Sequence, residues 1–501
     1  MSADIDALAS PEAAPAPVEA RSGLDAWHRA ELPDAPTPRG LAWLGTVGPG
    51  VVILGASIGS GEFLLGPAAF VRYGLTLLWL VGIAAVLQTL FNMELMRYTM
   101  ATGEPVFTGF MRTRPSSTVW AWIYAALYFL QVGWPGWAGA AAGAVFFLFS
   151  GRIAAAADQQ IVYWIGVATF LACAGVLLVG RRIERTLEIL NWILVIAIIS
   201  TFVVLCIVFV APGTWVAGVA GFIGLDPATG SFTLLPSGMD VFLLGAFVGY
   251  SGGGGVANLT LANWARDKGY GMAQHAGYIP AAVGGRKVPL AHTGFAFTPD
   301  AESMARWRGW WRIAVADQWG VYFGGVVLGM MLPGMLYVTF LESGQDIRGL
   351  GIAAALAEAM SARTVVLGML IALMGVWILA KTQLDLMEGM ARSLTDILWT
   401  GSKRLRTWRG GDVRFIYYGV LAAVVGWGLI ALQLTQPIVL LQISANMAGT
   451  VFVISAIHLL YVNNVLLPKP LRTPLWRNAA LVAMAVFYGF FVVLWIHSLL
   501  T

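Results

Sequence analysis

Eleven long apolar runs limit what this chain can fold into. They cover about residues 44–70, 75–99, 119–149, 161–180, 187–211, 239–264, 317–340, 363–392, 413–432, 437–462 and 478–499. An α-helix needs about 20 mainly apolar residues to cross a bilayer, and each run is long enough. Charged residues make up only 11% of the chain, compared with about 25% in an average soluble domain. The sequence therefore predicts an all-α membrane protein with about eleven transmembrane helices.

The basic residues predict how these spans are oriented. Lys and Arg accumulate in the cytoplasmic loops of membrane proteins. If the N-terminus is cytoplasmic, only Arg72, Arg152, Arg348 and Arg363 fall in segments on the opposite side, and Lys381 lies within a span. The remainder of the 30 Lys and Arg residues fall in cytoplasmic segments. We therefore expect a multi-pass protein of the cell (inner) membrane, with its N-terminus inside and its C-terminus outside.

Two segments outside the spans differ in composition from the rest of the chain. Residues 1–40 are rich in Ala, Pro and acidic residues and lack a basic region followed by an apolar one. They predict a disordered cytoplasmic tail and not a cleaved signal peptide. Residues 41–501 then form a single transmembrane domain. Within it, residues 265–316 predict a cytoplasmic loop whose Arg- and Trp-rich run at 306–312 is typical of an interfacial helix facing anionic lipid.

The first span is interrupted near its middle by residues that weaken a helix. Residues 57–62 read Ser-Ile-Gly-Ser-Gly-Glu. Each glycine costs about 1 kcal/mol relative to alanine inside a helix, and a carboxylate at mid-membrane costs roughly 3 kcal/mol on insertion scales. Irregular backbone at this depth is tolerated where it lines a cavity or is buried in protein. The stretch predicts a binding site made by Ser57, Gly59, Ser60, Gly61 and Glu62.

The sixth span carries a second interruption, the four consecutive glycines Gly252 to Gly255. Such a run does not hold a helix at mid-membrane, so backbone N–H and C=O groups are freed there. Because the two breaks lie five spans apart, they predict a 5+5 inverted repeat with span eleven peripheral. The alternative for either cluster is close packing of small residues between helices. The binding residues predicted here are Tyr250, Ser251, Gly252, Gly253 and Asn258.

Polar residues in other spans are candidates for an ion-coupling or gating network, namely Glu94, Lys381, Asp385, Glu388 and Asn446. Lys381, Asp385 and Glu388 recur at i, i+4 and i+7 on one face of the eighth span. They either neutralise one another or form a coupling-ion site. Glu94 lies three residues before Arg97, which favours an ion pair at the interface, with a gating contact as the alternative. Asn446 is more typical of a satisfied polar core residue than of a ligand.

No catalytic constellation emerges from the sequence. The five histidines show no His-Glu-x-x-His spacing, and a glycine run inside an apolar span lacks the strand that precedes a phosphate-binding loop. Cys173 and Cys206 both fall within apolar runs, which predicts reduced core residues. We therefore expect a protein that is not an enzyme, uses no cofactor and binds no nucleic acid. Its expected partners are membrane lipids and a small transported solute, and no oligomeric state is indicated.

The first span and its surroundings resemble a known family. Residues 48–79 read GPGVVILGASIGSGEFLLGPAAFVRYGLTLLW and are similar in spacing to the opening of the Nramp divalent-metal transporters. Gln88, Thr102-Gly103 and Met387-Glu388-Gly389 add to this resemblance, which is to a divergent branch of the family. It implies the LeuT-type fold of the amino acid–polyamine–cation superfamily, with helices 1 and 6 broken. It also implies alternating access and proton-linked uptake of a divalent metal.

Departures from the Nramp pattern bear on the substrate. The family's Asp-Pro-Gly-Asn falls on residues 59–62, so Gly59 replaces the metal-binding Asp and Glu62 replaces the Asn. The family's Met-Pro-His falls near residues 249–251, so the thioether that helps to select transition metals is absent. Span three contains no acidic residue. What remains is a hard oxygen site suited to Mg²⁺ or Mn²⁺, with Glu62 as the metal ligand.

A second resemblance implies a different substrate. Residues 58–61, Ile-Gly-Ser-Gly, are similar to the Gly-Ser-Gly signature of amino-acid transporters in the same superfamily. In those proteins, N–H groups at a half-helix N-terminus hold the substrate carboxylate. Glu62 would repel an anion unless it were protonated. The alternative is therefore an H⁺- or Na⁺-coupled symporter of a small carboxylate or amino acid, and the residue types leave it open.

Overall fold

The computed structural model describes residues 23–59, 61–179, 183–281, 288–345, 347, 352–434 and 437–500. In this part of the chain, ten helices are long and apolar enough to cross a membrane. The predicted span that is not among these ten is the sixth along the chain. It falls below that length because it is split into α12 (Val241–Gly249) and α13 (Val256–Lys268). The prediction of an all-α, multi-pass membrane protein is confirmed.

The helices follow the predicted spans closely. Before the sixth span they are α3 (Pro49–Ser57), η2 (Gly61–Leu65) and α4 (Gly66–Tyr73), α5 (Leu78–Thr102), α7 (Ser117–Val132) with α8 (Gly136–Ser150), α9 (Gln159–Val176) and α10 (Ile183–Phe209). After it come α14 (Ala301–Val315), η6 (Ala316–Phe323) and α15 (Gly324–Phe340), α17 (Val365–Gly401), α19 (Arg414–Ala431), α20 (Pro437–Val465) and α21 (Leu475–Leu500).

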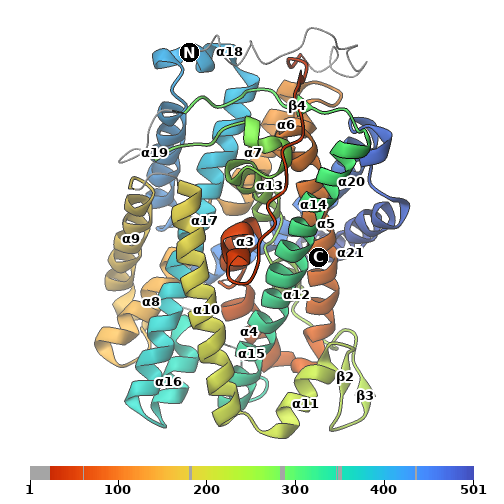
Figure 1. Cartoon of the computed structure of the whole chain (residues 1–501). Helices are drawn as coiled ribbons and strands as arrows, with labels where there is room; N and C mark the ends of the chain where they lie inside the picture. The colour runs from red at the N-terminus through yellow and green to blue at the C-terminus, as the bar shows by residue number, and fades with distance from the viewer. Residues whose placement is uncertain are drawn as a thin grey trace.

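Short elements connect the spans at the two ends of the molecule. One end carries β1 (His28–Arg29) paired in parallel with β4 (Phe295–Ala296), and also α6 (Val106–Met111) and α18 (Lys403–Thr407). The other end carries α11 (Pro212–Gly221), α16 (Ala355–Ser361) and the antiparallel pair of β2 (Leu225–Asp226) and β3 (Ser231–Phe232) (Figure 1). A short helix, α2 (Ala42–Thr46), leads into α3.

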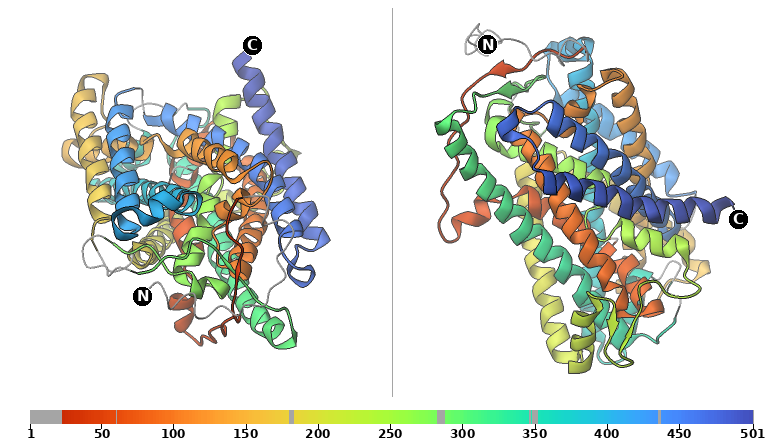
Figure 2. Two further views of the ribbon diagram at one scale, coloured as in Figure 1. Left: turned by 90° about the horizontal axis from the view of Figure 1, so that it is seen from above. Right: turned by 90° about the vertical axis from the view of Figure 1, so that its right-hand side faces the viewer.

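The first broken span lies in the centre of the molecule. All nine residues of α3 are buried, and α3 contacts α10, α13, α17 and η6. The second broken span lies directly beside it, because α3 packs on α13 while η2 and α4 pack on α12. In contrast, α21 lies at the edge of the molecule against α20 (Figure 2), as expected for a peripheral eleventh span.

The structure corrects one expectation about the segments outside the spans and adds detail to another. Residues 23–40 are not disordered, since His28 and Arg29 pair with β4 and Leu32 is fully buried; residues 1–22 lie outside the described part of the chain. The expected loop at 265–316 ends in α14, which continues through η6 into α15. Its side chains Trp307 and Trp310 are buried against protein. They therefore do not form a lipid-facing aromatic surface.

Candidate functional site

The first break places a carboxylate in the buried centre. Helix α3 ends at Ser57, and a π-helical turn, η2, begins at Gly61 and carries Glu62. Such turns inside helices are frequent at functional sites. Glu62 is fully buried, and neither of its carboxylate oxygens has a hydrogen-bond partner among the described residues. The Ser57 hydroxyl instead donates to the Ile53 carbonyl at 2.8 Å. Ser60 lies outside the described residues.

Glycines bring the first break into contact with its neighbours. A Cβ placed on Gly61 would lie 1.8 Å from the Tyr250 carbonyl oxygen, and one on Gly59 would lie 2.1 Å from the Thr382 hydroxyl. A Cβ on Gly329 of α15 would lie 3.5 Å from Cγ of Glu62. The predicted close approach of the two breaks is therefore present, and α15 leaves the Glu62 side chain its space.

The second break is an irregular stretch between α12 and α13 that depends on glycine. Gly252, Gly254 and Gly255 have φ angles of 110°, 79° and 54°, a region that residues with a side chain rarely adopt. A Cβ on Gly254 would also lie 2.3 Å from the Tyr250 ring. Packing of small residues alone does not require left-handed backbone, so the unwound helix is the better account of this cluster.

Two glutamines from other spans hold the backbone of the second break. Gln131 of α7 accepts a hydrogen bond from the Val256 amide at 3.0 Å and donates to the Gly254 carbonyl at 2.9 Å. Gln88 of α5 donates to the Ser251 carbonyl at 2.8 Å. Each glutamine thereby satisfies backbone groups that an unwound helix leaves without intrahelical partners.

A tyrosine that sequence reasoning missed completes this framework. The Tyr322 hydroxyl in η6 accepts from the Gly253 amide at 2.9 Å and donates to Gln88 Oε1 at 2.7 Å. Its only sequence signal is its place on the same span as Asp317 and Gln318. Like η2, η6 is a π-helical stretch. Both π-helical segments among the described residues therefore carry polar groups of this centre.

Asn258 connects the second break to the start of the first broken span. Its side-chain amide donates to Asn92 Oδ1 at 2.8 Å, and Asn92 donates to Gln318 Oε1 at 2.9 Å. Gln318 donates to Asp317 at 2.8 Å, and the same carboxylate accepts from the Gly48 and Gly50 amides at 2.8 Å each. This network therefore ends at the N-terminus of α3, where a carboxylate suits the helix dipole.

The remaining predicted binding side chains point elsewhere. The Tyr250 hydroxyl bonds to the Ser444 hydroxyl, and the Ser251 hydroxyl donates to the Phe247 carbonyl at 2.8 Å. Both residues contribute to the centre through their carbonyl groups, which contact Gly61 and Gln88. The structure thus brings the two predicted stretches together, but through backbone more than through side chains.

Of the predicted coupling residues, Lys381 and Asp385 lie nearest the first break. Lys381 pairs with Asp385 and also bonds to Asn191 of α10. A Cβ on Gly55 of α3 would lie 2.6 Å from the Lys381 ammonium, and Thr382 donates to the Gly55 carbonyl at 3.4 Å. These charges therefore join α17 to α3 less than one helical turn before Ser57.

The other three predicted coupling residues occupy separate contacts. Glu388 binds Arg392 and accepts from the Trp264 indole at 3.0 Å, which joins α17 to α13. Glu94 pairs with Arg97 at 2.7 Å and Arg477 at 2.9 Å, which joins α5 to α21. Asn446 donates to the Phe242 and Gln442 carbonyls at 3.0 and 2.8 Å. All three are well partnered, as expected for structural contacts.

The side-chain atoms at the centre that are buried without a partner in the described part of the chain are oxygens. Besides both Glu62 oxygens, Asn258 Oδ1 is buried without a partner in the described part of the chain. The Gly253 and Val256 amides already donate to side chains. Among the described residues no group of three or more His, Cys, Asp or Glu could hold a metal, so any bound cation would depend on one carboxylate together with amide and carbonyl oxygens.

Comparison with known structures shows which architecture this arrangement belongs to. A crystal structure of the Eremococcus coleocola manganese transporter, in complex with an aromatic bis-isothiourea compound, superimposes with a TM-score of 0.63 at 17% identity, over 93% of this chain and 89% of the other. A mutant of that transporter superimposes with a TM-score of 0.62 at 16% identity, over 97% and 91%. The chain has the LeuT-type fold.

This result confirms the predicted LeuT-type 5+5 arrangement with helices 1 and 6 broken. At 16–17% identity the likeness establishes the fold alone. No family model matches the sequence, and no curated protein matches it either. The resemblance to Nramp transporters is therefore supported at the level of the LeuT-type fold.

Proposed function

We propose that this protein is a secondary active transporter that carries a small hard cation, such as Mg²⁺ or Mn²⁺, between its two broken helices. The observation that supports this most directly is the chemistry of the buried side-chain atoms without a partner in the described part of the chain, Glu62 Oε1 and Oε2 and Asn258 Oδ1. Oxygen atoms are the ligands that these cations prefer. The shared fold with manganese transporters agrees with this proposal.

Transport would proceed by alternating access. The two broken spans pack on each other through α3 and α13, so they can move as one unit against the remaining helices. Glu62 lies at the middle of that unit, and Lys381 and Asp385 of α17 join it to a neighbouring helix at Gly55. In this proposal Lys381 and Asp385 form the coupling or gating contact, because it must loosen when α3 moves.

The proposal also assigns the orientation. The end of the molecule with β1, α6 and α18 carries Arg112 and Arg406 beside the connecting segments. Because basic residues favour the cytoplasmic side, we assign this end to the cytoplasm of a cell (inner) membrane protein. Residues 41–501 form its single transmembrane domain, and transport without catalysis is its activity.

Uptake into proteoliposomes tests the cargo. Mg²⁺, Mn²⁺ and a panel of small carboxylates are compared with and without a pH gradient, for the native protein and for Glu62→Gln. The matched control is Glu358→Gln. Glu358 of α16 is exposed and lies far from both breaks in the sequence. We expect cation flux that Glu62→Gln removes and Glu358→Gln leaves unchanged. Cation flux that survives Glu62→Gln would contradict the proposal.

The same experiment addresses the alternative cargo. A symporter of a small carboxylate or amino acid would use the backbone N–H groups of the breaks. Carboxylate uptake without any cation uptake would assign the site to that alternative. The Gly253 and Val256 amides already donate to side chains, so an anion would depend on the other amides of the second break.

A further inference from the structure

Residues 23–40, here called the strap, lie across the end of the molecule that carries β4. Figure 1 shows this segment, in red, running from β4 along the molecule to α3. The strap pairs with β4 at His28 and Arg29. Only α2 and a few residues separate its end from Pro49, the first residue of α3. The strap is therefore continuous with the first broken span through α2.

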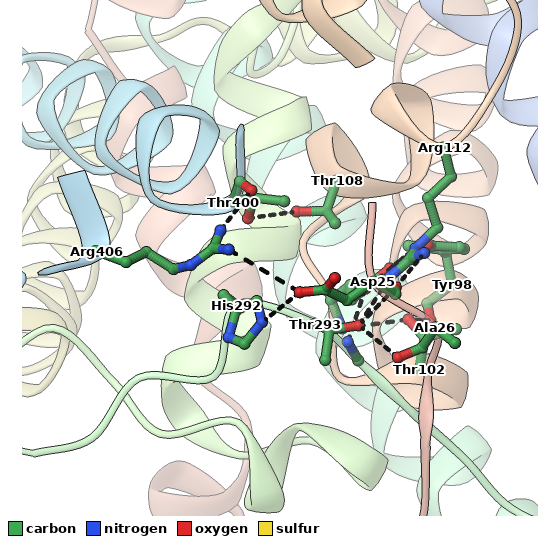
Figure 3. Close-up of polar contacts among 12 residues, drawn as sticks. Asp25, Ala26, Tyr98, Thr102, Thr108, Arg112, His292, Thr293, Thr400 and Arg406 are labelled. Carbon is green, nitrogen blue, oxygen red and sulfur yellow. Dashed lines mark hydrogen bonds and ion pairs between the residues drawn. The ribbon is translucent and has the colours of Figure 1, made fainter. Parts of the chain in front are cut away.

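The beginning of the strap is held by groups from three different segments (Figure 3). The Arg112 guanidinium donates to the Asp25 carbonyl at 2.9 Å, and the Thr293 hydroxyl lies 3.1 Å from the same oxygen. The Asp25 carboxylate binds His292 at 2.8 Å and lies 3.9 Å from Arg406 of α18. Asp25 thereby joins the segment before β4 to the segments that follow α6 and α17.

The middle of the strap is fixed to α14 and η5 (Gly271–His275) mainly through its backbone. Leu32 is fully buried, and its carbonyl accepts from Arg306 at 2.9 Å. The Pro33 carbonyl accepts from the Trp310 indole at 2.9 Å, and the Glu31 carbonyl lies 3.0 Å from His275 Nε2. Such contacts hold the chain in one place without requiring an apolar sequence.

A cavity of about 530 Å³ lies beneath the strap. Its wall is formed by residues 34–37 of the strap, by Gly45 and Thr46, by residues 268–270, and by Gln274 and Trp310. Lys268 binds Glu188 at 2.7 Å and the Val47 carbonyl at 3.3 Å. Lys268 thereby connects the wall of the cavity to Val47, just before the first residue of α3.

We propose that the strap is a lid that must leave α14 before α3 can move and open the central site to this end of the molecule. The strap is seated on α14 in this structure, with Leu32 buried and an open cavity between the strap, α2 and residues 268–270. This inference rests on the proposed transport function for its meaning, but its geometry can be tested without any cargo.

An engineered, reversible disulfide can lock the strap to α14. A Cβ on Gly309 of α14 would lie 2.8 Å from Cβ of Ala35, so the double variant Ala35→Cys/Gly309→Cys needs only a small shift to reach the usual separation of about 3.8 Å. Cys173 and Cys206 are buried and do not compete. Failure of this pair to cross-link under oxidant would contradict the seated strap.

Amide hydrogen exchange over residues 42–57 is compared between the oxidised and the reduced double variant. If the strap is a lid, oxidation slows exchange in this segment at least tenfold and reduction restores it. The single variants Ala35→Cys and Gly309→Cys should show no effect of oxidant. Equal exchange in both forms would overturn the proposal, because α3 would then open with the strap in place.

Flux in proteoliposomes gives the second measurement. The lid predicts that oxidation lowers cation flux at least tenfold and that reduction restores it. Slower exchange without measurable flux in any form would support the lid and reject the transport proposal. Normal flux in the locked protein would reject the lid and leave the transport proposal standing. The two proposals therefore fail in different ways.

Discussion

The two breaks have the same position in their repeats but opposite relations to their surroundings. At the first break, Glu62 is buried with no partner among the described residues, and the helix resumes as a π-helical turn. At the second break, Gln88, Gln131 and Tyr322 bind the backbone from three other spans. The carboxylate of the first break is thus left without a partner, while side chains from three other spans hold the second break.

This difference indicates a division of labour. A buried polar group without a partner costs about 1–3 kcal/mol, and more if it is charged. Such a cost at Glu62 persists in a folded protein where it serves function, whereas the second break needs rigid backbone to keep its carbonyl and amide groups in position. In the proposed transport function, the first break would therefore provide the carboxylate ligand, and the second would provide mainly the frame.

The strongest test of this division replaces Glu62 with an apolar side chain of similar length. Glu62→Met should lower cation flux by at least about 100-fold, because the buried carboxylate that has no partner among the described residues is lost. It should at the same time raise the free energy of unfolding by about 1–3 kcal/mol, since an unsatisfied buried group disappears. Flux and thermal unfolding in detergent measure both. Lower stability in this variant would show that Glu62 is structurally partnered.

Substitution of a side chain that holds the second break should change stability in the opposite direction. Gln131→Met removes the partners of the Val256 amide and the Gly254 carbonyl. We expect a loss of about 2–3 kcal/mol in the free energy of unfolding, because two buried backbone groups are left unsatisfied. Gln433→Met is the matched control, since Gln433 is exposed. Equal melting temperatures for the Gln131 and Gln433 variants would contradict a rigid second break.

Tyr322 tests whether the frame also sets the charge of the cargo. Tyr322→Phe frees the Gly253 amide as a hydrogen-bond donor, which makes the site less favourable to cations. We expect cation flux to fall about tenfold and stability by about 1 kcal/mol. Tyr337→Phe is the control, because the buried Tyr337 hydroxyl has no partner in the described part of the chain. If both variants behave alike, Tyr322 has no special role.

Sequence alone predicted the spans and both breaks, because apolar length and glycine placement are local properties. It also singled out Glu62 and Asn258 as candidates, since polar residues inside apolar runs stand out. It did not find Tyr322, because an aromatic residue in an apolar span is ordinarily packing, and only the fold brings its hydroxyl to Gly253. Hydrogen bonds between a side chain and backbone far away in the sequence leave no periodic pattern in the sequence.

The strap was predicted wrongly for a related reason. Its composition is rich in Ala, Pro and acidic residues, which indicates that the segment does not form a core of its own. Its order comes from carbonyl groups that accept hydrogen bonds from Arg306 and Trp310. Composition does not report on backbone acceptors, so a segment of this kind reads as disordered until its partners are known.

The smallest effect is expected at the strap. The test compares α3 of the first broken span with α13 of the second. The hydrogen bond from His292 lowers the pKa of Asp25 below its ordinary value of 3.8. The contribution of this contact is therefore complete at neutral pH and is lost as the pH falls below about 4. Because the Asp25 side chain is 65% exposed, Asp25→Asn should cost only about 0.5 kcal/mol.

Its consequence should be confined to the first broken span. The strap continues along the chain into α2 and α3, whereas α13 lies far from the strap in the sequence. Asp25→Asn at pH 7 should therefore speed amide exchange about twofold in residues 49–57 and leave residues 256–268 unchanged, since about 0.5 kcal/mol corresponds to such a factor. Faster exchange in both half-helices would mean that the strap stabilises the protein as a whole, and the two breaks would then not be independently controlled.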